Sequence, residues 1–132
     1  MTAERGFALH PLAAQDITEI WEYIAEDNPL AARRVREDIL SAIRAVVPFP
    51  QQGHRRTDLT SRPMRFIRVR DYLIAYAPDE KPLWVIAVMH GHRSPRVMAA
   101  ILRSSAHPAH VPQRVSFETA RPPLAINGLK VS

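Results

Sequence analysis

The stretch that decides the fold is MRFIRVRDYLIAYAPDEKPLWVIAVMH, residues 64–90. It is rich in β-branched and aromatic residues and is interrupted by turn-forming residues at Asp71 and at 78–82. It therefore predicts three strands, at residues 64–70, 72–77 and 83–90. Short turns between consecutive strands favour an antiparallel meander. The third strand is apolar on both faces, which indicates a central strand covered by helices on one side and by something else, with a partner protein as one candidate, on the other.

Residues 7–9 and Pro11 upstream predict an edge-like first strand and the start of a helix. From Leu12 onward, apolar residues recur at steps of three and four, and carboxylates occupy the other positions. This pattern is typical of an amphipathic helix with an acidic face. We expect Trp21 and Ile24 to belong chiefly to the core.

Asn28 and Pro29 predict the start of a second helix, because asparagine caps free amides and proline suits the first turn. Pro48 ends this helix, and the two helices then form a hairpin. Two pairs within it have the i,i+4 spacing of ion pairs: Arg33 with Glu37, and Arg34 with Asp38. Residues 53–62 are polar and basic, and we expect an exposed loop there.

Ser94 and Pro95 predict the start of a short closing helix. The expected fold class is therefore α+β, in the order β-α-α-β-β-β-α, with a helix hairpin packed on a small, mainly antiparallel sheet. We expect one domain over residues 1–103. Residues 104–132 contain prolines, little periodicity and few acidic groups, so they predict a loosely structured C-terminal tail.

The composition of the 132-residue chain limits its classes of function. Cysteine is absent, which excludes disulfides and thiolate metal sites and fits the cytoplasm. No stretch has the roughly 20 apolar residues of a membrane span, so we expect no membrane partner. The net charge is +5, and arginine supplies all but two of the 18 basic residues. Arginine suits anionic partners, although a bias toward arginine codons would give the same ratio.

Six arginines and one carboxylate lie between Arg55 and Arg70. Because side chains alternate across a strand, we expect Arg68 and Arg70 on one face and Arg65 on the other. This segment predicts a surface for nucleic acid or for an acidic partner. The alternative is a solvated face paired with the acidic helix.

His90, Gly91, His92 and Arg93 close the last strand. Two histidines one residue apart share a side of an extended chain, but no third ligand lies near them in sequence, so we expect no metal and no cofactor. With Arg93 to stabilise phosphorane charge, His90 and His92 are candidate catalytic residues for RNA cleavage. The alternative is that His90 is a hydrogen-bonded residue at the strand end.

Together these patterns resemble the RelE/ParE toxin superfamily from Phe7 to about Leu102. The matching strings are PLAAQDITEIWEYIA (11–25), Asn28-Pro29 with Ala31-Ala32, RFIRVRDYLIAY (65–76) and VMHGHR (88–93). The resemblance implies a growth-inhibiting toxin of a type II toxin-antitoxin system, of the kind that stabilises plasmids or chromosomes. It also implies a hetero-oligomer in which the C-terminal segment of a cognate antitoxin folds over the helix hairpin and the sheet.

The superfamily has two activities. RelE-like members cleave messenger RNA on the ribosome, but here Leu73 stands where an arginine is common, and Ala99 stands where a tyrosine is expected. Only Arg93 clearly remains of that catalytic set, although His92 is a possible substitute. Neither leucine nor alanine supplies a proton or a charge, so the ribosome-dependent endoribonuclease is the second hypothesis.

The first hypothesis is a ParE-like inhibitor of DNA gyrase, which needs a binding surface and no catalytic residues. For this target the candidate binding residues are Arg65, Arg68, Arg70 and Arg93, any of which could instead contact the antitoxin. A third hypothesis is a degenerate toxin that retains only antitoxin binding.

Overall fold

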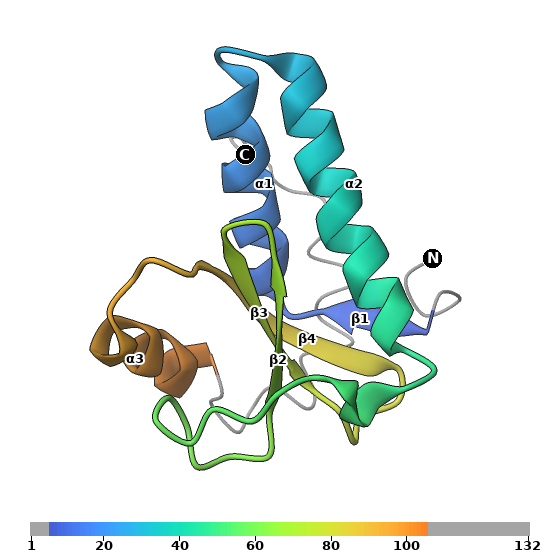
Figure 1. Ribbon diagram of the computed structural model, residues 1–132, viewed down its shortest axis with the longest axis vertical. Helices are drawn as coiled ribbons and strands as arrows, with labels where there is room; N and C mark the ends of the chain where they lie inside the picture. The colour runs from blue at the N-terminus through green and yellow to red at the C-terminus, as the bar shows by residue number, and fades with distance from the viewer. Residues whose placement is uncertain (1–5, 106–132) are drawn as a thin grey trace.

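The computed structural model describes residues 6–105, which contain three α-helices, one short 3-10 helix and four strands. In chain order the elements are β1 (Phe7–Leu9), α1 (Pro11–Ala25), α2 (Pro29–Val46), η2 (Pro50–Gln52), β2 (Arg65–Val69), β3 (Tyr72–Ala77), β4 (Leu83–His90) and α3 (Pro95–Ser105) (Figure 1). This order confirms the predicted fold class. The expected tail, residues 104–132, lies outside the described residues except for Ser104 and Ser105, which end α3.

The four strands form one mixed sheet in the order β1-β4-β3-β2. β2, β3 and β4 pair antiparallel, which confirms the predicted meander, and β1 runs parallel to β4. A parallel pair needs a long connection, and here the whole hairpin and the first two meander strands lie between its members. β1 is therefore an edge strand and β4 a central strand, as expected.

Both hairpin helices begin with a side-chain cap and a proline in the first turn. The His10 imidazole accepts a hydrogen bond from the Leu12 amide at 3.0 Å, and the Asn28 side chain accepts one from the Ala31 amide at 3.0 Å. Such caps satisfy amides that the helix leaves free. The connected ends of the hairpin project beyond the sheet (Figure 1). Within residues 6–105, no helix is long and apolar enough to cross a membrane.

The hairpin packs on one face of the sheet and makes the first core cluster. Its buried members are Phe7, Ala13, Ile17, Val35, Ile39, Ile43, Val46, Tyr72, Ile74, Tyr76, Leu83, Val85 and Val88. The apolar faces of the two helices therefore pack against alternate residues of the central strands, as expected for amphipathic elements.

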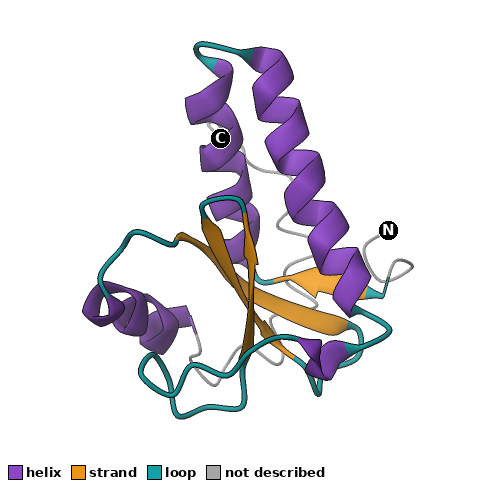
Figure 2. Cartoon of the chain, in the orientation of Figure 1, coloured by secondary structure: helices purple, strands orange, loops and turns teal. Residues whose placement is uncertain are grey.

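The opposite face of the sheet is covered by α3 and by part of the loop before β2, and it makes the second core cluster (Figure 2). The buried side chains of that cover are Met98 and Leu102 from α3, and Leu59 and Met64 from the loop. The expectation of a second cover over β4 is thus confirmed, and the chain itself supplies it.

A β-bulge in β4 decides which of its side chains face each core cluster. Ala75 of β3 pairs with Ala87, but the next residue, Tyr76, pairs with Val85, so Ile86 is the extra residue. Ile86 and Ala87 consequently both belong to the second cluster, and Val85 and Val88 both belong to the first. Without this extra residue, one half of β4 would turn its side chains to the wrong faces.

Three expectations need correction. Trp21 is not chiefly core, because 40% of it is exposed on the flank of α1, whereas Ile24 does pack against the first cluster. Residues 53–62 are not uniformly exposed, since Leu59 is anchored in the second cluster. Neither expected helix pair is an ion pair: Asp38 pairs with Arg70 instead, and Glu37 has no ion-pair partner among residues 6–105.

Candidate functional site

Four of the predicted site residues, Arg68, His90, His92 and Arg93, lie where β4 ends beside the turn between β2 and β3. We call this region the meander end and define it as Arg68, Tyr72, His90, His92 and Arg93. Tyr72 and His90 are paired neighbours on β3 and β4, and His92 and Arg93 follow in the exposed loop before α3. The fold thus brings residues from β2, β3 and the loop after β4 to one end of the sheet.

The Arg68 side chain lies over the backbone of Gly91. A Cβ atom built on Gly91 would lie 2.7 Å from the nearer guanidinium nitrogen of Arg68, so a side chain at this position would displace the end of the flexible arginine. The Gly91 amide itself donates to the Asp71 carbonyl at 2.7 Å, which holds the loop after β4 against the turn between β2 and β3. The Arg68 guanidinium makes no ion pair among the described residues and remains exposed.

Arg70 lies outside the strand and has a different environment from Arg68. β2 ends at Val69, and Arg70 occupies the first position of the turn with φ +54°, in the left-handed region. Its Nε donates to the Asp38 carboxylate of α2 at 2.8 Å, on the hairpin side of the sheet. The expectation that Arg68 and Arg70 share a face is wrong, because strand alternation stops before the turn.

Arg65 is held at the other end of β2. Its guanidinium donates to the Gln51 side chain at 2.8 Å and to the Gly53 carbonyl at 2.9 Å. These bonds fix the loop that carries η2 against β2. Of the four arginines predicted to bind the target, Arg65 and Arg70 therefore also hold the fold together, and Arg68 and Arg93 share the meander end.

The rings of Tyr72 and His90 are in contact, with centroids 4.9 Å apart and planes at 46°. Tyr72 is buried and His90 is exposed, so the imidazole packs against a buried ring and is still accessible from solvent. Burial raises the pKa of the Tyr72 phenol above its usual range, and the nearby Asp71 carboxylate adds to the shift. Tyr72 is therefore protonated and neutral at neutral pH.

Asp16 of α1 interacts electrostatically with Arg93 of the meander end, and the sequence did not single it out. β1 ends at Leu9, so farther along β4 the Val88 amide has no strand partner on that side, and the Asp16 carboxylate accepts its hydrogen bond at 2.9 Å. Burial raises the pKa of Asp16 to about 6, and the hydrogen bond from the Val88 amide and, to a smaller extent, the Arg93 guanidinium partly offset this increase. The pattern of the helix alone marks Asp16 only as one more surface carboxylate.

The metal and nuclease expectations can be compared with this geometry. β4 ends at His90 and His92 lies in the following turn, so the two histidines do not share one extended strand as expected. Among residues 6–105 no three metal-ligating side chains are grouped. Leu73 is buried in the second cluster, and Ala99 lies partly buried on α3. Neither position presents a group that can transfer a proton.

The comparison with known families decides the identity. Residues 7–95, more than half of the chain, match the family described as the ParE toxin of the type II toxin-antitoxin system parDE. The chain belongs to this family. The match runs from the start of β1 to the first residue of α3 and contains every residue of the meander end. No curated protein matches the chain.

Membership in the ParE toxin family confirms the resemblance seen in the sequence and has one direct consequence. A toxin of a parDE system has a cognate antitoxin as its partner. The protein is thus the toxin component of a type II toxin-antitoxin pair.

Proposed function

We propose that this ParE-family toxin inhibits DNA gyrase by binding it through the meander end, and that its antitoxin holds it inactive in a cytoplasmic hetero-oligomer. The observation that carries the proposal is that Arg68 and Arg93 are both exposed at one end of the sheet. Leu73 and Ala99, in contrast, offer no group that can transfer a proton. Binding by exposed arginines needs no catalytic step and no cofactor.

Arg68 and Arg93 are the main contacts in this proposal, because neither forms an ion pair among the described residues. Arg65 and Arg70 are secondary contacts, since part of each guanidinium is already bonded within the chain. Arginine is common among the few residues that dominate protein interfaces, where it forms two parallel hydrogen bonds with a carboxylate.

A supercoiling assay with purified gyrase tests the proposal. The wild-type toxin is expected to inhibit supercoiling, and Arg68→Ala and Arg93→Ala should each raise the half-inhibitory concentration by about tenfold or more. Arg103→Ala is the matched control, because Arg103 is an exposed arginine near the end of α3, and it should change the value by less than about twofold. Supercoiling that is unchanged by a folded, antitoxin-free toxin would contradict gyrase as the target.

A ribosome-dependent endoribonuclease is the second candidate, favoured by the exposed imidazole of His90 against Tyr72 and by His92 and Arg93 in the adjoining loop. Histidine can transfer protons near neutral pH, and arginine can stabilise phosphorane charge. This candidate predicts cleavage of messenger RNA at defined codon positions on ribosomes, lost in His92→Ala or Arg93→Ala. Intact transcripts in that assay, together with inhibited gyrase, would exclude it.

A further inference from the structure

A shallow hollow lies between α1 and α2 on the part of the hairpin that projects beyond the sheet (Figure 1). Its lining residues are Thr18, Trp21, Arg33, Arg36 and Glu37, and its volume is about 380 Å³. All five are exposed, and none of them belongs to either core cluster. The hollow therefore lies on a face of the hairpin that the sheet does not cover.

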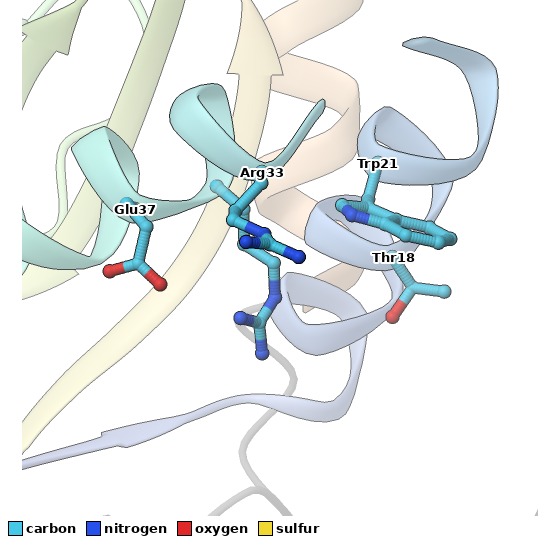
Figure 3. A pocket seen from close by; sticks show the side chains of 5 residues that line it. Thr18, Trp21, Arg33 and Glu37 are labelled. Carbon is cyan, nitrogen blue, oxygen red and sulfur yellow. The ribbon is translucent and has the colours of Figure 1, made fainter. Parts of the chain in front are cut away.

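Trp21 gives the hollow an apolar wall. It is 40% exposed, and Thr18 lies about one helical turn before it on the same side of α1. In Figure 3 the indole extends beyond the helix above Thr18, with no other labelled side chain covering it. Large aromatic side chains are normally buried, and exposed ones often serve as anchors at interfaces.

Arg33 and Arg36 give the α2 side of the hollow a positive charge. Both are exposed, and neither makes an ion pair or a side-chain hydrogen bond within residues 6–105. Glu37 has the spacing to pair with Arg33, but Figure 3 shows its carboxylate on the side of the arginine away from Trp21. The hollow thus offers two unpaired guanidinium groups beside an apolar ring.

The α1 side of the same face carries the opposite charge. Glu22 and Glu26 follow Thr18 at successive steps of four residues, a spacing that keeps them on the same side of the helix. Both are exposed, and neither carboxylate has an ion pair or a side-chain hydrogen bond in the described part of the chain. No basic residue lies within Pro11–Ala25. One exposed face of the hairpin is therefore divided into an acidic helix and a helix with two free arginines.

We propose that this face is a self-association surface, through which two copies of the free toxin form a symmetric dimer with α1 of each copy over α2 of the other. Glu22 and Glu26 of one copy bind Arg33 and Arg36 of the second copy, and the indole of Trp21 packs on those guanidinium groups. Carboxylates and indole faces both attract arginine. This association goes beyond the proposed function, because it depends on neither gyrase nor the antitoxin.

The separation of charge selects both the partner and the symmetry axis. Two hairpins packed face to face can be related by a two-fold axis that runs across the helices or along them. An axis across the helices lays α1 on α1 and opposes like charges, whereas an axis along them lays acidic α1 on α2 at the level of Arg33 and Arg36. Each favourable contact then occurs twice. A nucleic acid fits this face less well, because the α1 carboxylates repel its phosphates.

Sedimentation equilibrium of the free, full-length toxin tests the dimer. Because exposed ion pairs contribute modestly, we expect a dissociation constant of about 1–100 µM. The constant should rise by at least about threefold between about 50 mM and 500 mM salt, since salt screens the paired charges. A toxin that stays monomeric up to about 200 µM at low salt would overturn the proposal and leave the hollow to a different occupant, such as the antitoxin.

Tryptophan fluorescence tests whether Trp21 is at the contact. The chain has two tryptophans and Trp84 is only 1% exposed, so quenching by acrylamide reports mainly on Trp21. Acrylamide is neutral and leaves the ion pairs unscreened. Quenching should decrease as the toxin concentration rises through the dissociation constant. Dimerisation without protection of Trp21 would place the contact elsewhere and contradict the proposal.

Two aromatic residues of α1 provide a matched pair of variants. Trp21→Ala should weaken self-association by about tenfold or more, as expected for an aromatic anchor. Tyr23→Ala is the control, because Tyr23 is 78% exposed on the same helix but does not line the hollow, and it should change the dissociation constant by less than about twofold. Equal effects of the two changes would count against a specific role for Trp21.

A charge exchange tests the pairing between helices. One variant combines Arg33→Glu with Arg36→Glu, and the other combines Glu22→Arg with Glu26→Arg. Each variant alone opposes like charges in the dimer, so each should self-associate at least about 100-fold more weakly than the wild type. An equal mixture restores opposite charges at both contacts, and its dissociation constant should return to within about tenfold of the wild-type value.

Restored association in the mixture also shows that both variants are folded, and circular dichroism checks each one alone. Two folded variants that fail to associate when mixed would overturn the proposed pairing, as would undiminished self-association of either variant. A monomeric wild type that still inhibits gyrase overturns the dimer and leaves the proposed function intact. A dimeric toxin without effect on gyrase contradicts the proposed function alone.

Discussion

Asp16 illustrates how a single side chain can complete a sheet. β4 is longer than β1, so the Val88 amide would have no partner beyond the end of β1 without the Asp16 carboxylate. An unsatisfied buried amide costs about 1–3 kcal/mol, which explains why a partly buried carboxylate is tolerated there. Because burial raises the pKa of Asp16 to about 6, the stability of the fold should depend on pH in the range where many assays are run.

The raised pKa of Asp16 predicts an unusual pH dependence. Its ordinary value is 3.8 and its folded value is about 6, so between these values the folded chain binds more protons than the unfolded chain. The free energy of unfolding should therefore fall as pH rises from about 4 to about 6. Asp16→Asn keeps an acceptor for the Val88 amide but does not titrate. The variant should therefore lack the part of the decrease in unfolding free energy that Asp16 causes.

The expected size of the effect is about 1 kcal/mol, because Asp16 is partly exposed and solvent reduces the cost that its raised pKa would otherwise imply. Urea unfolding of both proteins at several pH values measures it. Parallel stability curves for the wild type and Asp16→Asn would contradict the prediction.

At Arg70 the backbone conformation favours glycine, whereas the ion pair with Asp38 needs the arginine side chain. Its φ of +54° favours glycine, yet its side chain pairs with Asp38. Both Arg70→Gly and Arg70→Ala remove that pair, but only glycine relieves the left-handed backbone. We expect Arg70→Gly to be more stable than Arg70→Ala by about 1 kcal/mol, the reverse of the order expected inside a helix or strand. Thermal unfolding compares them, and an alanine variant at least as stable as the glycine variant would be inconsistent with this strain.

At the scale of elements, α3 completes the fold. The family match ends at Pro95, the first residue of α3, but Met98 and Leu102 from this helix are buried in the second cluster. α3 therefore protects the face of β4 that the hairpin does not reach. A helix docked through so few residues depends strongly on each of them.

Leu102→Ala should consequently reduce the free energy of unfolding by about 2–5 kcal/mol, the range found when a fully buried leucine leaves a cavity. Leu102 is 1% exposed, whereas its neighbour Arg103 is exposed, so Arg103→Ala should stay within about 0.5 kcal/mol of the wild type. Denaturant unfolding of the two variants makes the comparison. Equal stability would show that α3 is not part of the cooperative core.

The elements themselves were largely predictable from local sequence. Asn28 and Pro29 start α2 as expected, Pro48 follows its end, and β3 and β4 have the predicted bounds. Caps, prolines and hydrophobic period act over a few residues, so they are visible in the sequence. The β4 bulge was not predicted, because an apolar run without alternation does not indicate which residue is extra.

At the scale of the whole molecule, the hairpin and the meander provide two separate exposed regions. The meander end carries Arg68 and Arg93, and a shallow hollow on the projecting half of the hairpin is lined by Thr18, Trp21, Arg33, Arg36 and Glu37 (Figure 3).

The sequence by itself determined the class of the elements, their order and the family, because these depend on local pattern and on short strings that remain recognisable. Tertiary structure decided which side chains are available. Arg70 reaches Asp38, Arg65 reaches Gln51, Trp21 stays exposed and Asp16 reaches Val88. Each outcome depends on which element lies beside the residue in space. A contact between residues far apart in the chain leaves no signal in a local sequence pattern.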